Sequence, residues 1–82
     1  MKELVAFLAK NIVDKPKAVK VKEERNSSGN KFILSVDEHD MGKIIGKNGR
    51  IIKAIRAVLR IKAIKEGSRV YLELAEQKPL NS

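Results

Sequence analysis

The chain has 82 residues and no cysteine, and it carries 18 Lys and Arg against 10 Asp and Glu, a net charge of +8. This length fits one small domain and excludes two, while the lack of cysteine excludes disulfides and thiolate metal sites. The single histidine, His39, has no second histidine or cysteine to complete a metal site, and the longest early apolar stretch, LVAFLA, is too short to cross a membrane. We therefore expect a soluble cytoplasmic protein without a metal or cofactor.

The first predicted element is an amphipathic helix over residues 3–13. Its apolar residues Leu4, Leu8 and Ile12 recur at helical spacing. The Asp-Lys-Pro sequence at 14–16 is expected to end the helix, because proline disfavours helical geometry in the residue before it.

Two strands are predicted next. Residues 18–24 alternate, with Val19 and Val21 on one side and lysines on the other, and residues 31–36 alternate again. The Asn, Ser and Gly residues at 25–30 are typical of a turn. We expect an antiparallel hairpin whose second strand buries Phe32, Leu34 and Val36.

Helical patterns resume after the hairpin. A short helix is expected over residues 41–45, with Asp40 preferred to Asp37 as its N-terminal cap because an apolar residue follows it. After the glycines at 46 and 49, a longer helix is expected from Arg50 to about Lys62 or Ala63.

The last predicted element is a strand over residues 69–74, with Val70, Leu72 and Leu74 facing inward. The order helix, strand, strand, short helix, long helix, strand predicts an α+β fold with a three-stranded sheet and the helices packed on one of its faces. The domain is expected to cover residues 1–76, followed by a frayed tail at 77–82.

The positive charge is concentrated around the two glycines. No acidic residue lies between Gly42 and Lys65, and the rest of the chain holds ten cations and ten acids, so the whole net charge of +8 comes from this block. Its eight cations are Lys43, Lys47, Arg50, Lys53, Arg56, Arg60, Lys62 and Lys65. A basic block in an otherwise neutral chain indicates a site for a polyanion.

The segment IIGKNGRII at 44–52 allows two interpretations. As an ordinary corner between two helices, it explains Gly46 as the left-handed end of the first helix, but it explains Gly49 and the exposed Lys47 and Asn48 less well. Alternatively, a sugar–phosphate backbone lies against the bare glycines, where the free amides and positive dipole at the start of the next helix meet its phosphates. Lys47 and Arg50 then add charge at the same place, and we favour this second interpretation.

Two faces of the long helix follow from its 100° rotation per residue. One arc is interpreted as core and consists of Ile51, Ile52, Ile55, Val58 and Leu59. A cationic stripe of Lys53, Arg56 and Arg60 is expected on nearly the opposite side. That stripe is either an ordinary solvated face or, since it contains no acid, a face that steers nucleic acid.

A third stripe consists of Ala54, Ala57, Ile61 and Ile64. Small alanines beside large exposed isoleucines predict a surface for self-association or for a partner, with Ile61 as its anchor. The alternative is that the helix ends earlier and Ile64 turns inward to the core.

On these residues, the chain resembles the KH domains. IIGKNGRII is similar to the KH signature of an aliphatic pair, Gly-x-x-Gly and a following isoleucine, and the element order is similar to the type II arrangement. The segments IVDKPKAVKV, HDMGKIIGKNGRIIKAIRAVL and KEGSRVYLEL resemble the small bacterial KhpA family, also called YlqC-like, over essentially the whole chain.

The resemblance implies a single type II KH domain, α-β-β-α-α-β, that binds single-stranded RNA without catalysis and holds about four nucleotides in a groove clamped by the Gly-x-x-Gly loop. By match to the motif, the clamp is Gly46, Lys47, Asn48 and Gly49, preceded by the aliphatic pair Ile44 and Ile45, of which Ile45 is expected to be more structural than contacting. Lys43, Arg50 and Lys53 complete the expected RNA site. The family also implies a homodimer, or pairing with a larger KH-containing protein of the Jag/EloR type, in RNA regulation and cell elongation.

The sequence disfavours three other functions and one other mode of RNA binding. A protein–protein adaptor with this fold is disfavoured by Lys-Asn in the glycine loop, where an acidic or bulky residue would favour it. A helix–turn–helix reader of duplex DNA is disfavoured by the strand patterns that flank the helices. No nucleophile is paired with a base, which disfavours an enzyme, and three aromatic residues, Phe7, Phe32 and Tyr71, are too few for a base-stacking platform.

Overall fold

The computed structural model describes residues 1–75, so residue 76 and the tail expected at 77–82 lie outside the described residues. The elements are α1 (Lys2–Lys10), β1 (Lys20–Asn26), β2 (Gly29–Ser35), α2 (Met41–Ile45), α3 (Arg50–Glu66) and β3 (Val70–Leu74). Short 3-10 turns lie at Pro16–Ala18, Glu38–Asp40 and Lys47–Gly49. The predicted α+β class and element order are confirmed. No helix within residues 1–75 is long and apolar enough to cross a membrane.

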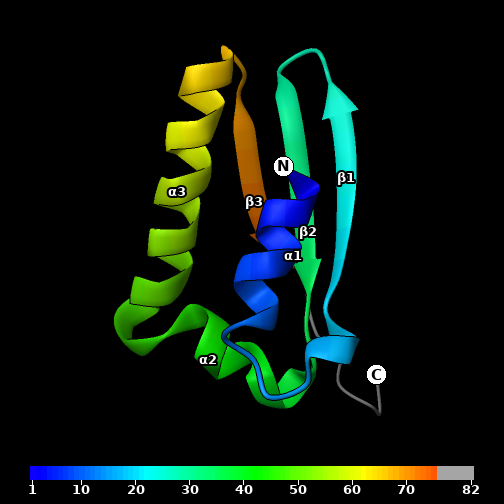
Figure 1. The fold of residues 1–82 in the computed structure, drawn as a ribbon, viewed down its shortest axis with the longest axis vertical. Helices are drawn as coiled ribbons and strands as arrows, with labels where there is room; N and C mark the ends of the chain where they lie inside the picture. The colour runs from blue at the N-terminus through cyan, green and yellow to red at the C-terminus, as the bar shows by residue number, and fades with distance from the viewer. Residues whose placement is uncertain (76–82) are drawn as a thin grey trace.

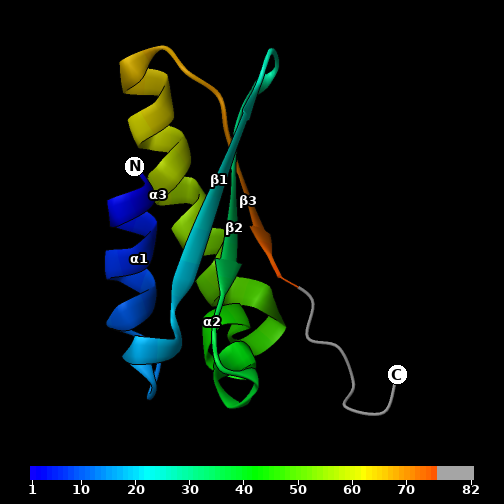
Figure 2. The same ribbon diagram turned by 90° about the vertical axis from the view of Figure 1, so that its right-hand side faces the viewer.

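The three strands form one mixed sheet in the order β1-β2-β3. β1 and β2 make the predicted antiparallel hairpin, in which Asn26 pairs with Gly29, and β3 runs parallel to β2 along its other edge. Helices α1 and α3 lie side by side on one face of this sheet (Figure 1), and in the turned view no helix of residues 1–75 covers the other face (Figure 2). The arrangement places α2 and the glycine turn at one end of the molecule and the β1–β2 turn at the opposite end.

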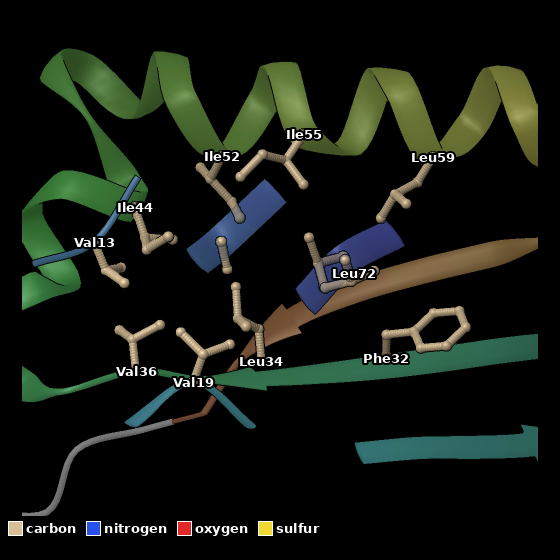
Figure 3. Close-up of a cluster of buried hydrophobic side chains, with 12 residues drawn as sticks. Val13, Val19, Phe32, Leu34, Val36, Ile44, Ile52, Ile55, Leu59 and Leu72 are labelled. Atoms are coloured by element: carbon tan, nitrogen blue, oxygen red, sulfur yellow. The ribbon is translucent and has the colours of Figure 1, made fainter. Parts of the chain in front are cut away.

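The core fills the space between α3, α1 and the sheet. Ile52, Ile55 and Leu59 point from α3 toward the sheet, and Phe32, Leu34 and Leu72 point back toward the helices (Figure 3). Alternation along β2 therefore buries Phe32, Leu34 and Val36, as predicted, because successive side chains in a strand point to opposite faces.

The core arc of α3 differs from the predicted one. Ile51 and Val58 are 37% and 44% exposed, whereas Ala63 is buried. The buried set is Ile52, Ile55, Leu59 and Ala63, whose spacing of three, four and four keeps it on one narrow line. Ile51 and Val58, seven residues apart, lie together at the edge of this line, so the single helix–sheet contact does not cover them.

The ends of two helices also differ from the predictions. α3 continues three residues past Ala63 to Glu66, where Gly67 adopts a left-handed conformation and its main-chain N–H donates to the carbonyls of Ala63 and Ile64. α1 ends at Lys10, before the Asp-Lys-Pro sequence, and at this end the Asn11 side-chain Nδ2 donates to the carbonyl of Phe7 at 2.7 Å. Asparagine is favoured at helix ends rather than in helix interiors, because its side chain bonds nearby main-chain groups.

A pair of glycine substitutions tests these backbone assignments. Gly42 lies within α2 without a positive φ, and a Cβ there would meet no atom within 4 Å. We expect Gly42→Ala to raise the free energy of unfolding by about 0.5–1 kcal/mol, because alanine loses less backbone entropy. Gly67→Ala should lower it by about 1–2 kcal/mol, because φ is +70° there. Urea denaturation measures both, and a shift of the same sign in the two variants would contradict the assignment.

Candidate nucleic-acid interface

The turn between α2 and α3 depends on close contact between Gly46 and Ile51. Gly46 has φ 75° and ψ 173°, and a Cβ on it would lie 2.3 Å from Ile51 Cγ1 and 2.9 Å from the Ile51 main-chain nitrogen. Any side chain here would force apart the end of α2 and the start of α3. Gly46 is therefore required by the fold, although its ψ of 173° differs from the left-handed helix end that the helix-corner interpretation expected.

Gly49 has a different environment. It is left-handed (φ 73°, ψ 16°), and Asn48 before it is also left-handed (φ 56°, ψ 27°). A Cβ on Gly49 would meet nothing nearer than Lys53 Cε at 3.9 Å. Asparagine is among the few residues that tolerate this conformation, so Asn48 fits its position. The space above Gly49 is open, which leaves room for a ligand against the main chain.

The main-chain amides of the loop fall into two groups. The N–H of Gly49 donates to the carbonyl of Gly46 at 3.1 Å, and the N–H of Arg50 donates to the carbonyl of Lys47. The expectation that the amides at the start of α3 are free is therefore wrong for these two. The amides of Lys47 and Asn48 donate to no acceptor among residues 1–75, and both residues are exposed. Successive unpaired amides in such a turn form a concave site for an anion.

The aliphatic pair before the loop has the opposite roles from those expected. Ile44 is fully buried, whereas Ile45 is 37% exposed. Ile44 therefore anchors α2 in the core, and Ile45 presents an apolar surface directly beside the glycine loop.

The cationic stripe of α3 lies toward β3, rather than opposite the core. Arg56 Nε donates to the main-chain carbonyl of Leu72 at 3.2 Å, which places this side chain across the outer edge of the sheet. Lys53 lies against Gly49 and Arg60 is one turn beyond Arg56, so the stripe leads from the glycine loop along this edge.

A shallow groove follows the same edge. It is lined by Arg56, Leu59, Arg60, Val70, Tyr71, Leu72 and Glu73. The sequence showed the cations and the alternation of the last strand separately. It gave no signal that β3 runs beside α3, so Arg56, Arg60 and Tyr71 were missed as groove residues.

Most of the basic block is electrostatically unpaired. Lys43 forms an ion pair with Asp14, and none of the other seven cations pairs with a carboxylate among the described residues.

Asp37 lies in the turn before α2 and accepts the His39 main-chain N–H at 2.9 Å. That hydrogen bond, helped by the His39 ring and by Lys15, holds the pKa of Asp37 below its usual value. Within residues 1–75, no acidic and histidine side chains gather into a potential metal site.

Asp40 occupies the N-cap position of α2 but does not act as the predicted cap. Its side chain makes no capping hydrogen bond to the helix. Its two oxygens accept the main-chain N–H groups of Asp14 at 3.1 Å and Lys15 at 3.0 Å, in the segment between α1 and β1. The residue whose side chain caps a local turn is Asp37, which serves the 3-10 turn before α2.

The alanine–isoleucine stripe is exposed on α3. Ala54 and Ala57 are exposed, and Ile61 and Ile64 are 69% and 70% exposed, so the alternative in which Ile64 enters the core is wrong. Val58 adjoins the stripe. Ile64 also borders a second shallow hollow, lined by Arg60, Ala63, Ile64, Ser68, Arg69, Val70 and Tyr71, which continues the groove toward the end of α3.

The family model and the similar sequences agree on one family. The family model described as "KhpA/KhpB, KH domain" matches residues 2–74. The chain belongs to the KhpA/KhpB family of KH domains. The RNA-binding protein KhpA of Clostridium perfringens is 50% identical over 74 residues, 90% of this chain and 99% of that protein. The RNA-binding protein KhpA of Chlamydia pneumoniae is 47% identical over 78 residues, 95% of this chain and 100% of that protein.

Two solved structures of a larger protein, Era, contain a part with a similar fold. Era in complex with MgGDPNP and nucleotides 1506–1542 of 16S ribosomal RNA is similar over 89% of this chain, with 29% identity and a TM-score of 0.67. Era of Aquifex aeolicus bound to GDP and AlF4⁻ gives 28% identity and a TM-score of 0.66. The chain spans 28% of either Era chain, so the similarity concerns that part of Era alone.

The two loop glycines should respond differently to alanine. Gly46→Ala combines a positive φ with overlap on Ile51 and should lower the free energy of unfolding by about 2–5 kcal/mol. Gly49→Ala has open space and should lose only about 1–2 kcal/mol for its left-handed backbone. Urea denaturation of both variants measures the difference. Equal losses would mean that Gly46 does not pack against Ile51 as described.

Proposed function

We propose that this chain binds single-stranded RNA without catalysis and that residues 46–49 clamp the phosphate backbone. The observation that carries the proposal is the pair of exposed amides at Lys47 and Asn48, which have no acceptor among residues 1–75, beside cations that have no acidic partner in the same part of the chain. Amides and positive charge that converge on an open surface suit a phosphate, because each donates to or attracts its oxygens. The names of the KhpA relatives and the RNA in the Era complex support this proposal. A cytoplasmic location, as expected from the sequence, is part of it.

The groove beside α3 is the proposed path of the bases. From Gly49 to Arg60 the helix rises about 16 Å, a length suited to the about four nucleotides that KH domains hold. Ile45 and Tyr71, both partly exposed, offer apolar surface to the bases, and Lys53 and Arg60 offer charge to the backbone. Ile44 is excluded from contact by its burial and supports the site from below.

The clamp is tested with the double variant Lys47→Asp and Asn48→Asp. Aspartate tolerates the left-handed conformation at position 48, so the loop geometry should survive. We expect the affinity for a fluorescent single-stranded RNA to fall at least about tenfold at low salt, and the dependence of log Kd on log salt to become shallower, since phosphate contacts are lost. Fluorescence anisotropy at several salt concentrations measures both.

A charge-matched control is Lys22→Asp with Ser27→Asp, at exposed positions on the hairpin. Each double variant lowers the net charge by three, from +8 to +5. The control should keep most of the affinity. Equal losses in the two variants would mean that total charge, rather than the glycine loop, holds the RNA. If the wild type does not bind RNA at all, the adaptor function becomes the better account.

A second proposal concerns pairing through α3. The exposed stripe of Ala54, Ala57 and Ile61, widened by Val58, is an apolar surface that suits another helix, because small residues permit close approach around a large anchor. We propose that it pairs with a second copy of this chain or with a Jag/EloR-type protein. The cationic flank toward β3 stays free in such a pair, so two grooves could then bind one RNA strand with a gain in avidity.

The pairing face is tested by Ile61→Asp, with Phe7→Asp as the matched control. Both residues are exposed apolar side chains, at 69% and 63%, on different helices. We expect the wild type and Phe7→Asp to sediment as dimers and Ile61→Asp as a monomer, because the dimer would bury an unpaired carboxylate. Dissociation by Phe7→Asp alone would place the interface on α1 instead.

A further inference from the structure

The buried carboxylate of Asp40 lies outside the glycine loop, and the inference drawn from it rests on the RNA site proposed above. Within residues 1–75, Asp40 is the one charged side chain that is buried, with 2% of its surface exposed. A buried carboxylate is costly unless hydrogen bonds replace its water. The N–H groups of Asp14 and Lys15, 26 and 25 residues away in sequence, supply those bonds.

We propose that Asp40 is a positioning residue for the glycine loop. Its side chain stands where a helix cap would normally bond the first turn of α2. Instead, the carboxylate ties the start of α2 to the segment between α1 and β1. The hydrogen bonds to Asp14 and Lys15 therefore replace the local capping bond, and they fix the position at which α2 begins.

α2 needs an external anchor because it is short. It has five residues, and a helix of that length is not stable by itself. Within α2, Ile44 is its one fully buried side chain, and at its end Gly46 packs on Ile51. Asp40 supplies the third fixed point, about 9 Å before Gly46 along the chain at helical rise. Three fixed points define the orientation of α2 and, with it, the direction in which the Lys47 and Asn48 amides face.

Two ion pairs join the same two segments as the buried hydrogen bonds of Asp40. Lys43 in α2 pairs with Asp14, and Lys15 Nζ lies 3.6 Å from Asp37 Oδ2. Exposed pairs contribute little each, but both cross between residues 14–15 and residues 37–43, around Asp40. We include Lys43, expected from the sequence to contact RNA, in this positioning because its ammonium group pairs with Asp14.

The test compares Asp40→Asn with Phe32→Leu. Asparagine keeps one acceptor but turns an NH₂ group toward an N–H donor, so one bond is lost and α2 is released. Phe32→Leu weakens the core at the end away from Ile44 (Figure 3). At a temperature where both variants are fully folded, we expect Asp40→Asn to lose at least about fivefold in RNA affinity and Phe32→Leu to keep wild-type affinity. Wild-type affinity in Asp40→Asn would overturn the proposal.

Two further measurements test the positioning role of Asp40 if the chain does not bind RNA or if Asp40→Asn does not fold. The amide NMR signals of Gly46 and Gly49 should shift or broaden in Asp40→Asn and stay unchanged in Phe32→Leu, whether or not RNA binds. Should Asp40→Asn fail to fold, a double-mutant cycle of Asp14→Lys and Lys43→Asp, both at exposed positions, replaces it. Positioning predicts that the swapped pair recovers affinity about two- to fivefold beyond the product of the single changes. Independent effects of the two changes would show that this pair does not couple the two segments and would overturn the assignment.

Discussion

The missing side chain at Gly46 is the constraint on which the rest of the site depends. With no Cβ there, the end of α2 packs directly on Ile51, and α3 starts immediately beside α2. This contact forces the chain between them into a tight turn with Asn48 and Gly49 left-handed. This turn leaves the amides of Lys47 and Asn48 without an acceptor in the described part of the chain. A steric requirement of the fold thus creates unpaired donors at the surface, so the helix-corner and phosphate-clamp interpretations are compatible.

The periodicity of apolar residues predicted most of the helices and strands, because each of these elements packs against the core along one face. Phe32, Leu34 and Leu72 alternate and are buried, since a strand with one open face separates inward from outward residues cleanly. The same reasoning was wrong for Ile51 and Val58, because hydrophobicity shows which residues can be buried and not how wide the covering surface is. Contacts between distant segments were equally invisible: the tie from Asp40 to Asp14 and the edge formed by β3 beside Arg56 leave no local pattern.

The structure sorts the mixed residues of α3 onto separate surfaces. Cations and apolar residues alternate in the sequence of this helix, yet Lys53, Arg56 and Arg60 lie toward β3 while Ile61 lies on an outward stripe. Arg56 also satisfies a main-chain carbonyl at the sheet edge, which leaves its charge beside the groove. One helix therefore separates a surface suited to a polyanion from a surface suited to another protein, and occupation of one does not require loss of the other.

The helices on the two sides of the glycine turn are held in different ways. This difference explains why the carboxylate of Asp40 is buried in so small a core. Among the described residues, α3 is held by four buried side chains, whereas α2 has one, Ile44, and the Lys47 and Asn48 that follow it are exposed. Hydrogen bonds to a carboxylate are directional, and apolar contact is not. Asp40 therefore supplies orientation where burial is scarce, at the cost of desolvating one charge, and it does so from a position that the ligand never has to reach.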